Sequence, residues 1–289
     1  MKKFLRRLFF SAGYLATFGF VNYKLYSTIE EVTFHRAHFI KMLQLPIDRI
    51  IPLTPFFVWA YISLYLIILA AFFVDILPKH FYANRVIIRL ISYKLKLKIS
   101  RKTLKVISKV AAKMDRAIKL LLSSDEKNKL LLRKSQTIIA FFLVAIVSSI
   151  IYLAFPLIVH RPAVKLTGSL SAEMLRFVWR TDLPDNTLPS QHTAFSILAF
   201  LIINRLVNKP IIGAWMIKLR RKIYTFHVSF SGGFFLIWAI FIILSTMFIK
   251  QHLFIDLIAG IIVSYLSYRI AFSKLIEKNL QRIKFLTKY

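Results

Sequence analysis

A histidine stands at the start of a long apolar run in the segment "LPSQHTAFS", residues 188–196. Ser190 and Gln191 lie where a helix would begin, and the unpaired N–H groups and the dipole of a helix N-terminus favour an anion. His192, in the first turn, could then protonate a leaving group. The same residues also fit a simpler interpretation, in which Ser190 caps the helix and His192 lies at a membrane interface.

A second histidine lies in the segment "KQHLFID", residues 250–256. His252 and Asp256 are four positions apart, which predicts that they share one face of a helix. The carboxylate could accept a hydrogen bond from the Nδ1–H group of the imidazole and leave Nε2 free to act as a nucleophile. Lys250 adds a charge that attracts phosphate. Because a carboxylate inside an apolar run is costly, Asp256 indicates a functional role.

Arg161, in the segment "HRPAVK" at residues 160–165, carries a planar guanidinium that suits phosphate oxygens. Pro162 is expected to end the preceding helix and to fix the turn. Taken alone, Arg161 also fits a residue that stops a membrane span at the interface. The three segments together would supply an anion clamp, a proton donor and an oriented nucleophile, which are the parts of a phosphoryl-transfer site.

The composition places these residues in a membrane protein. The chain of 289 residues is 57% hydrophobic, and 42 Lys and Arg against 12 Asp and Glu give a net charge of +30. Such charge suits nucleic acid or an anionic membrane, and the long uncharged runs favour the membrane. The absence of cysteine excludes a thiolate metal site and a cysteine nucleophile. No GxSxG, Walker or GxGxxG motif is present, which disfavours a serine hydrolase and a nucleotide-driven transporter.

Six apolar runs approach the length that spans a bilayer, which is about 20 residues. The first run is weaker because Arg6 and Arg7 interrupt its start; a signal peptide is the alternative, but no small-residue cleavage site precedes Tyr23. We therefore predict an all-α polytopic membrane protein, namely a six-helix transmembrane bundle with an interfacial amphipathic helical segment. The six runs are 4–23, 55–77, 137–159, 193–207, 229–249 and 253–272.

Basic residues are strongly biased to one side of these spans. Segment 78–134 holds 17 Lys and Arg against three acids, and the N-terminus, segment 208–227 and the tail after Phe272 add more. Segments 23–54 and 160–189 each hold four basic and three acidic residues. By the positive-inside rule, both termini are cytoplasmic and the three motifs face outward. The expected location is the plasma or cytoplasmic membrane, with anionic lipid bound at the basic face.

Three regions follow from this arrangement. Residues 1–77 hold two spans and an outer loop, residues 78–134 are a basic cytoplasmic or interfacial segment, and residues 135–289 are a catalytic four-helix core. Between Leu104 and Leu121, apolar residues recur at helical spacing among Lys and Arg, which predicts a helix in the interface. We interpret the middle region as a topology determinant and lipid anchor. A partner-binding role is the alternative, and nucleic acid is not expected as a partner.

The order of the motifs resembles the type 2 phosphatidic acid phosphatase (PAP2) superfamily. The segments "RP", "LPSQHTAFS" and "STMFIKQHLFID" follow one another at helix ends, and the resemblance covers about residues 150–272. These segments are most similar to the branch that holds inositol phosphotransferases and related bacterial membrane phosphatases. The family fold implied is a helical bundle in the membrane.

The resemblance implies a metal-independent reaction that needs no cofactor. His252 would attack phosphorus and form a phosphohistidine, and Asp256 would orient it. His192 would protonate the leaving oxygen and then activate the acceptor. Arg161, Ser190 and nearby backbone groups would hold the phosphoryl oxygens, which suits a reaction catalysed by positioning and electrostatics.

The sequence also departs from the family pattern at three positions. Ala154 stands where the family has a lysine, Gln191 where it has a glycine, and Thr246 where it has an arginine. Lys165 or Lys250 is expected to supply the missing positive charge. Gln191 is expected to contact the phosphate together with these lysines.

The main functional expectation is a phosphatase that hydrolyses a lipid phosphate or pyrophosphate. The alternative is a phosphotransferase, which shares the first half-reaction and passes the phosphoryl head group to a lipid or sugar hydroxyl. A channel, transporter or inactive scaffold is the non-enzymatic alternative, mildly favoured by Asp75 within a span. A zinc site made of the same His and Asp residues is also conceivable, but no HExxH-type spacing supports it.

Overall fold

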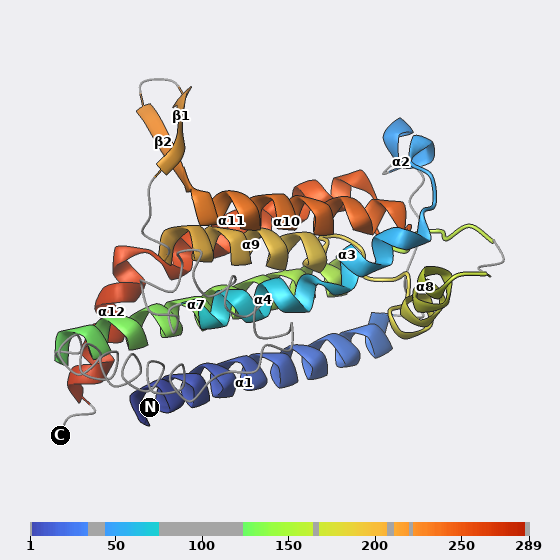
Figure 1. The fold of residues 1–289 in the computed structure, drawn as a ribbon. Helices are drawn as coiled ribbons and strands as arrows, with labels where there is room; N and C mark the ends of the chain where they lie inside the picture. Colours follow the sequence, from blue (N-terminus) through green and yellow to red (C-terminus); the bar gives the residue numbers. More distant parts are fainter. Residues whose placement is uncertain are drawn as a thin grey trace, which may run out of the picture.

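The computed structural model describes residues 2–33, 44–74, 124–163, 168–206, 211–219 and 222–286 (Figure 1). Nearly all of its elements are helices, as predicted. In chain order they are α1 (Lys2–Thr33), α2 (Pro46–Ile50), the 3-10 turn η3 (Pro55–Phe57), α3 (Val58–Ile62), α4 (Leu64–Phe73), α7 (Ser124–Ala154), α8 (Leu170–Thr181), α9 (Gln191–Leu206), β1 (Ile211–Leu219), β2 (Lys222–Ser229), α10 (Phe230–Phe248), α11 (Phe254–Ala271) and α12 (Lys274–Leu286).

Helix α9 is the centre of the bundle. It packs against α4, α7, α10 and α11, while α1 packs against α7 and α4 on the outside (Figure 1). A helix that is apolar nearly all round belongs inside a bundle rather than on its surface. The packing therefore holds the helix that carries His192 on several sides. Its fully buried residues include Ala194, Leu198, Ala199, Ile202 and Ile203.

Three of the described helical stretches are long and apolar enough to cross a membrane: Pro55–Phe73, Leu132–Ala154 and Phe254–Ala271. The apolar part of α10, Gly232–Phe248, is shorter. Large apolar side chains also cover the exposed face of α11, including Ile261, Ile262 and Leu266. These features indicate an integral membrane protein. The predicted number of six spans is not confirmed.

Helix α7 ends earlier than the sequence analysis predicts. It stops at Ala154, whereas the apolar run extends to Val159. The residue before a proline disfavours the helical conformation, and Phe155 stands before Pro156. The helix is therefore ended here, and the prediction that Pro162 ends it is wrong. The residues that follow form a loop, in which Val159 N–H donates to the Pro184 carbonyl at 2.8 Å.

The two ends of the bundle carry different elements. The start of α1, the helix α12 and the antiparallel hairpin β1–β2 lie at one end, and α2 and α8 lie at the other (Figure 1). The hairpin and α8 fall in segments 208–227 and 160–189, which the sequence analysis treated as loops. Segments predicted to share one side of a membrane thus lie at one end of the bundle. Which end faces the cytoplasm stays a prediction.

Most of the predicted basic region 78–134 lies outside the described residues, as does Asp75. The part from Ser124 onward belongs to α7, which continues without a break past residue 135. The predicted interfacial helix between Leu104 and Leu121 therefore stays a prediction.

Candidate active site

The two predicted histidines lie beside each other at the α2 and α8 end of the bundle. His192 is in the first turn of α9, and His252 is in the short connection between α10 and α11. Their ring centroids are 6.0 Å apart, with the planes tilted by 52°. The Ser190 N–H donates to the main-chain carbonyl of Asp256 at 3.0 Å and so ties the two motifs together.

His252 precedes α11 rather than lying on it. The helix begins at Phe254 with Leu253 as its N-cap, so the prediction that His252 and Asp256 share one helix face is wrong. The two side chains still approach each other, with His252 Nδ1 3.5 Å from Asp256 Oδ2. This distance is longer than an ordinary hydrogen bond, and no other partner of Nδ1 is found among the described residues. Catalytic hydrogen bonds are often this long before substrate binds.

The main chain fixes the position of His252. The N–H groups of Gln251 and His252 donate to the Thr246 carbonyl at 2.9 and 3.3 Å. Asp256 Oδ2 accepts from Leu253 N–H at 2.8 Å and caps the start of α11. Asp256 is 1% exposed, so this capping carboxylate is enclosed by protein beside the imidazole.

Ser190 is the cap of α9. Its Oγ accepts from the Thr193 N–H at 3.3 Å, and the residue is fully buried. Tyr152 on α7 fixes the same turn by donating to the Pro189 carbonyl at 2.6 Å. Gln191, the first residue of α9, is only partly buried. The segment therefore serves as the helix cap of the simpler interpretation, and it also delivers His192 to His252.

Arg161 ties three segments together around the site. Its guanidinium donates to the carbonyls of Trp179 (2.7 Å) and Asp182 and to Oε1 of Gln251. It also lies over the Trp179 ring, 5.4 Å from the centroid. Burial lowers the pKa of Arg161, and the nearby Asp182 carboxylate opposes that shift. A guanidinium stays charged under these conditions. Its Nε–H is buried and has no partner among the described residues, so one donor is left for a ligand.

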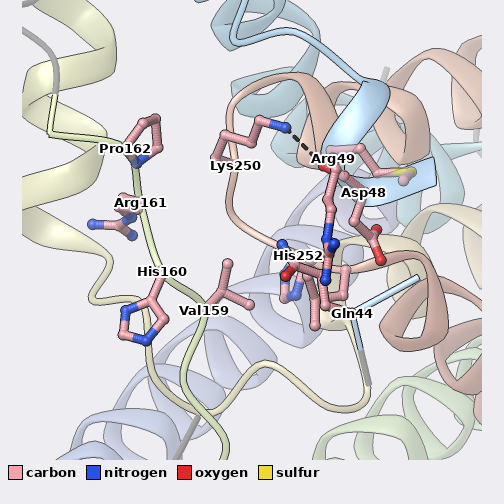
Figure 2. A pocket seen from close by; sticks show the side chains of 11 residues that line it. Gln44, Asp48, Arg49, Val159, His160, Arg161, Pro162, Lys250 and His252 are labelled. Carbon is pink, nitrogen blue, oxygen red and sulfur yellow. Dashed lines mark hydrogen bonds between the residues drawn. The ribbon is translucent and has the colours of Figure 1, made fainter. Parts of the chain in front are cut away.

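Of the two lysines predicted to bind phosphate, Lys250 lies in the described part of the chain. Lys250 Nζ donates to the main-chain carbonyls of Asp48, at 3.0 Å, and Ile51. Its ammonium is thus turned toward α2 rather than toward His252 (Figure 2). Burial lowers the pKa of Lys250, while the Asp48 carboxylate opposes the shift. Lys165 lies outside the described residues.

Three residues that the sequence did not mark as functional complete the site, namely Tyr61, Asp182 and Gln251. Tyr61 stacks on His192, with ring centroids 3.9 Å apart and planes 22° from parallel. Its hydroxyl donates to the Asp182 carboxylate, which also accepts from Gln251 Nε2 at 3.1 Å. No local pattern marks these residues, because their partners are far away in the sequence. Asp182 counted only as one charge in a balanced loop.

Asp48 is a fourth missed residue. Its carboxylate accepts from Phe254 N–H at 2.7 Å and from Leu45 N–H at 2.7 Å. It is 7% exposed. The short helix α2 thereby docks on the N-terminus of α11, directly beside His252.

A cavity of about 260 Å³ opens beside His252 (Figure 2). One wall is formed by His160, Arg161 and Pro162, and the opposite wall by Gln44, Asp48 and Arg49. Because Arg49, Arg161 and Lys250 all line it, the cavity suits an anionic group. His252 also lines the cavity and would then lie next to that group.

The comparisons with known proteins agree with the sequence motifs. A sequence profile of the PAP2 superfamily matches residues 137–279. The matched region contains Arg161, His192, His252 and Asp256, but neither Tyr61 nor the cavity residues of α2. No curated protein and no solved structure gives a match.

Proposed function

We propose that the chain is a membrane-embedded phosphatase of the PAP2 superfamily, which hydrolyses a lipid phosphate or diphosphate through a phosphohistidine. The observation that carries the proposal is the placement of His252 in the wall of a cationic cavity, with the ring centroid of His192 6.0 Å from its own. The match over residues 137–279 supports the same reaction class. The apolar helices around the site suit a lipid substrate.

In the first half-reaction, His252 Nε2 attacks phosphorus, and the bond from phosphorus to the lipid oxygen breaks. His192 gives its proton to the departing oxygen, so a lipid alcohol leaves. In the second half-reaction, His192 takes a proton from water, and the hydroxide attacks the phosphohistidine. The P–N bond breaks, and inorganic phosphate leaves with both residues restored.

The surrounding residues supply positioning and charge. Asp256, 3.5 Å from His252 Nδ1, favours the tautomer with the free Nε2. Arg161 holds the His252 segment through Gln251, and its Nε–H, which has no partner among the described residues, is the donor that we assign to a phosphoryl oxygen. Phosphoryl transfer depends chiefly on such positioning and on charge stabilisation.

The test is phosphate release by the purified protein in detergent, with phosphatidate, phosphatidylglycerophosphate and a polyprenyl diphosphate as substrates. We expect activity on at least one of them that survives a chelator, and an acid-labile phosphoprotein intermediate that His252→Ala abolishes. Arg176→Gln is the matched control, because Arg176 is an exposed cation on α8 that pairs with Glu173 at 3.7 Å. Activity that needs one specific metal would contradict the proposed reaction, and phosphate transfer only to an added alcohol would indicate the phosphotransferase.

A further inference from the structure

Tyr61 provides a flat surface for His192. The residue belongs to α3, outside the matched region 137–279, and is 4% exposed. Its ring lies 3.9 Å from the imidazole, nearly parallel to it. Within the part of the chain that the structure describes, no side chain donates to or accepts from the His192 ring. Stacking on Tyr61 is therefore the contact that fixes the plane of this imidazole.

Tyr61 is itself held from the other side. Its hydroxyl donates to Oδ2 of Asp182, while Tyr26 donates to Oδ1 at 3.3 Å. Gln251 Nε2 reaches the same Asp182 Oδ2 at 3.1 Å and the Tyr61 hydroxyl at 3.3 Å. These bonds hold the hydroxyl end of Tyr61 in place, and the apolar cluster of Val58, Ala172, Leu175, Val178 and Ile249 packs around its ring.

The same network reaches His252. Gln251 is the residue before His252, and its Oε1 accepts from Arg161. Arg161 donates in turn to the Asp182 carbonyl. One connected set of hydrogen bonds therefore places the surface under His192 and the segment of His252 relative to each other.

We infer that Tyr61 is a positioning residue for His192: its ring, fixed by Asp182, holds the imidazole in the plane from which it delivers a proton to the leaving oxygen. This inference rests on the proposed function. Misplacing a catalytic group by about 1 Å can cost about 10²-fold in rate. Such a loss falls on proton transfer, so it spares the first half-reaction of substrates whose leaving group departs as a stable anion.

The experiment compares Tyr61→Leu and Tyr61→Phe on a lipid phosphate and on p-nitrophenyl phosphate. We expect Tyr61→Leu to lower kcat on the lipid by up to about 10²-fold, and to leave the rate of p-nitrophenol release in the first turnover, which reports the first half-reaction alone, nearly unchanged. Tyr61→Phe keeps the stacked ring and loses the hydroxyl's bonds with Asp182 and Gln251, so the decrease in kcat should be intermediate. In a His192→Ala background, Tyr61→Leu should have no further effect on either substrate.

Phe57→Leu is the matched control. Phe57 packs against the same apolar cluster and stacks on Phe248, with ring centroids 4.1 Å apart, and among the described residues its ring stacks on neither histidine. Its loss should lower both substrates in the same proportion, if at all. An equal loss in Tyr61→Leu on the lipid and on first-turnover release of p-nitrophenol, or an undiminished extra loss in the His192→Ala background, would overturn the inference while leaving the hydrolase intact. A wild-type protein that cleaves neither substrate would overturn the proposed function instead.

Discussion

Gly260 of α11 faces the carbonyl oxygen of Ser190 so closely that a Cβ on residue 260 would lie 2.7 Å from that oxygen. The same Cβ would lie 3.0 Å from Thr193 Cβ. Only a glycine lets α11 approach the first turn of α9 at this distance, since neither backbone nor Cβ atoms can rotate away. The contact between the helices that carry the two histidines thus depends on one missing methyl group.

We therefore expect Gly260→Ala to push the Ser190 turn outward and to shift His192. Activity on a lipid phosphate should fall by up to about 10²-fold, measured as kcat/KM in detergent. Gly13→Ala is the control, because nothing lies within 4 Å of a Cβ at Gly13 on α1. In the control, the better helix propensity of Ala should stabilise the protein slightly, by about 1 kcal/mol. Full activity of Gly260→Ala would show that this helix contact does not place His192.

The apolar runs in the sequence located the helices of the core well, because helical periodicity and length are local properties. Helices α9, α10 and α11 each begin and end within two residues of the predicted runs. The position of His252 was missed for a local reason: Leu253 caps α11 through its backbone, and no Ser or Thr marks the start. Sequence spacing alone placed the imidazole on the helix.

The polar network could not be predicted in this way. Tyr61 and Asp182 are 121 residues apart, and Asp48 reaches Phe254 across 206 residues. Such pairs are created by helix packing, and neither residue stands in a motif that shows its partner. The three predicted segments could be grouped because charge bias assigned them to one side, but the residues that connect them could not.

Arg161→Lys should fail to replace Arg161. The guanidinium donates hydrogen bonds to three acceptors, on Trp179, Asp182 and Gln251. A single ammonium cannot match that geometry. We expect KM to rise and kcat to fall for every substrate, in phosphate-release assays. Arg176→Lys, on the exposed face of α8, should behave as wild type. A fully active Arg161→Lys protein would reduce Arg161 to a point charge.

Arg49 should distinguish substrates by their charge. It lines the cavity on the wall opposite Arg161 (Figure 2), where it can reach a second phosphate of a lipid diphosphate. Arg49→Gln should raise KM for a polyprenyl diphosphate about tenfold, because a hydrogen bond to a charged group is worth about 1.5–3 kcal/mol. The KM for a lipid monophosphate should change much less. Equal changes for the two substrates would exclude this role.

Single cysteines can test the predicted orientation, since the chain has none of its own. Arg176 on α8 and Lys278 on α12 are exposed and lie at opposite ends of the bundle (Figure 1). We expect a membrane-impermeant thiol reagent to label Arg176→Cys from outside intact cells, and to label Lys278→Cys only after permeabilisation. The reverse pattern would place the site at the cytoplasmic face, and equal labelling would contradict the two-sided topology.

Replacement of the two histidines should lower the activity in different ways. His252→Ala removes the atom that attacks phosphorus, so no intermediate can form, and activity should be lost on both a lipid phosphate and p-nitrophenyl phosphate. His192→Ala leaves the attack possible but removes the proton donor, which is worth about 10²–10⁴-fold. On the lipid, the loss should appear from the first turnover. With p-nitrophenyl phosphate, whose leaving group is a stable anion, the first turnover should be largely spared, and later turnovers should slow because His192 also activates water.

Asp256→Asn tests the role of the carboxylate separately from the roles of the two histidines. An amide oxygen in the place of Oδ2 still accepts from Leu253 N–H and caps α11, but, being uncharged, it favours the His252 tautomer with a free Nε2 less strongly. We expect a weaker form of the His252→Ala defect on both substrates, with unchanged thermal stability in detergent. If His192→Ala, like His252→Ala, releases no p-nitrophenol in the first turnover, the assigned roles are wrong. The Ser190 turn would then be only the cap of a helix at a membrane surface.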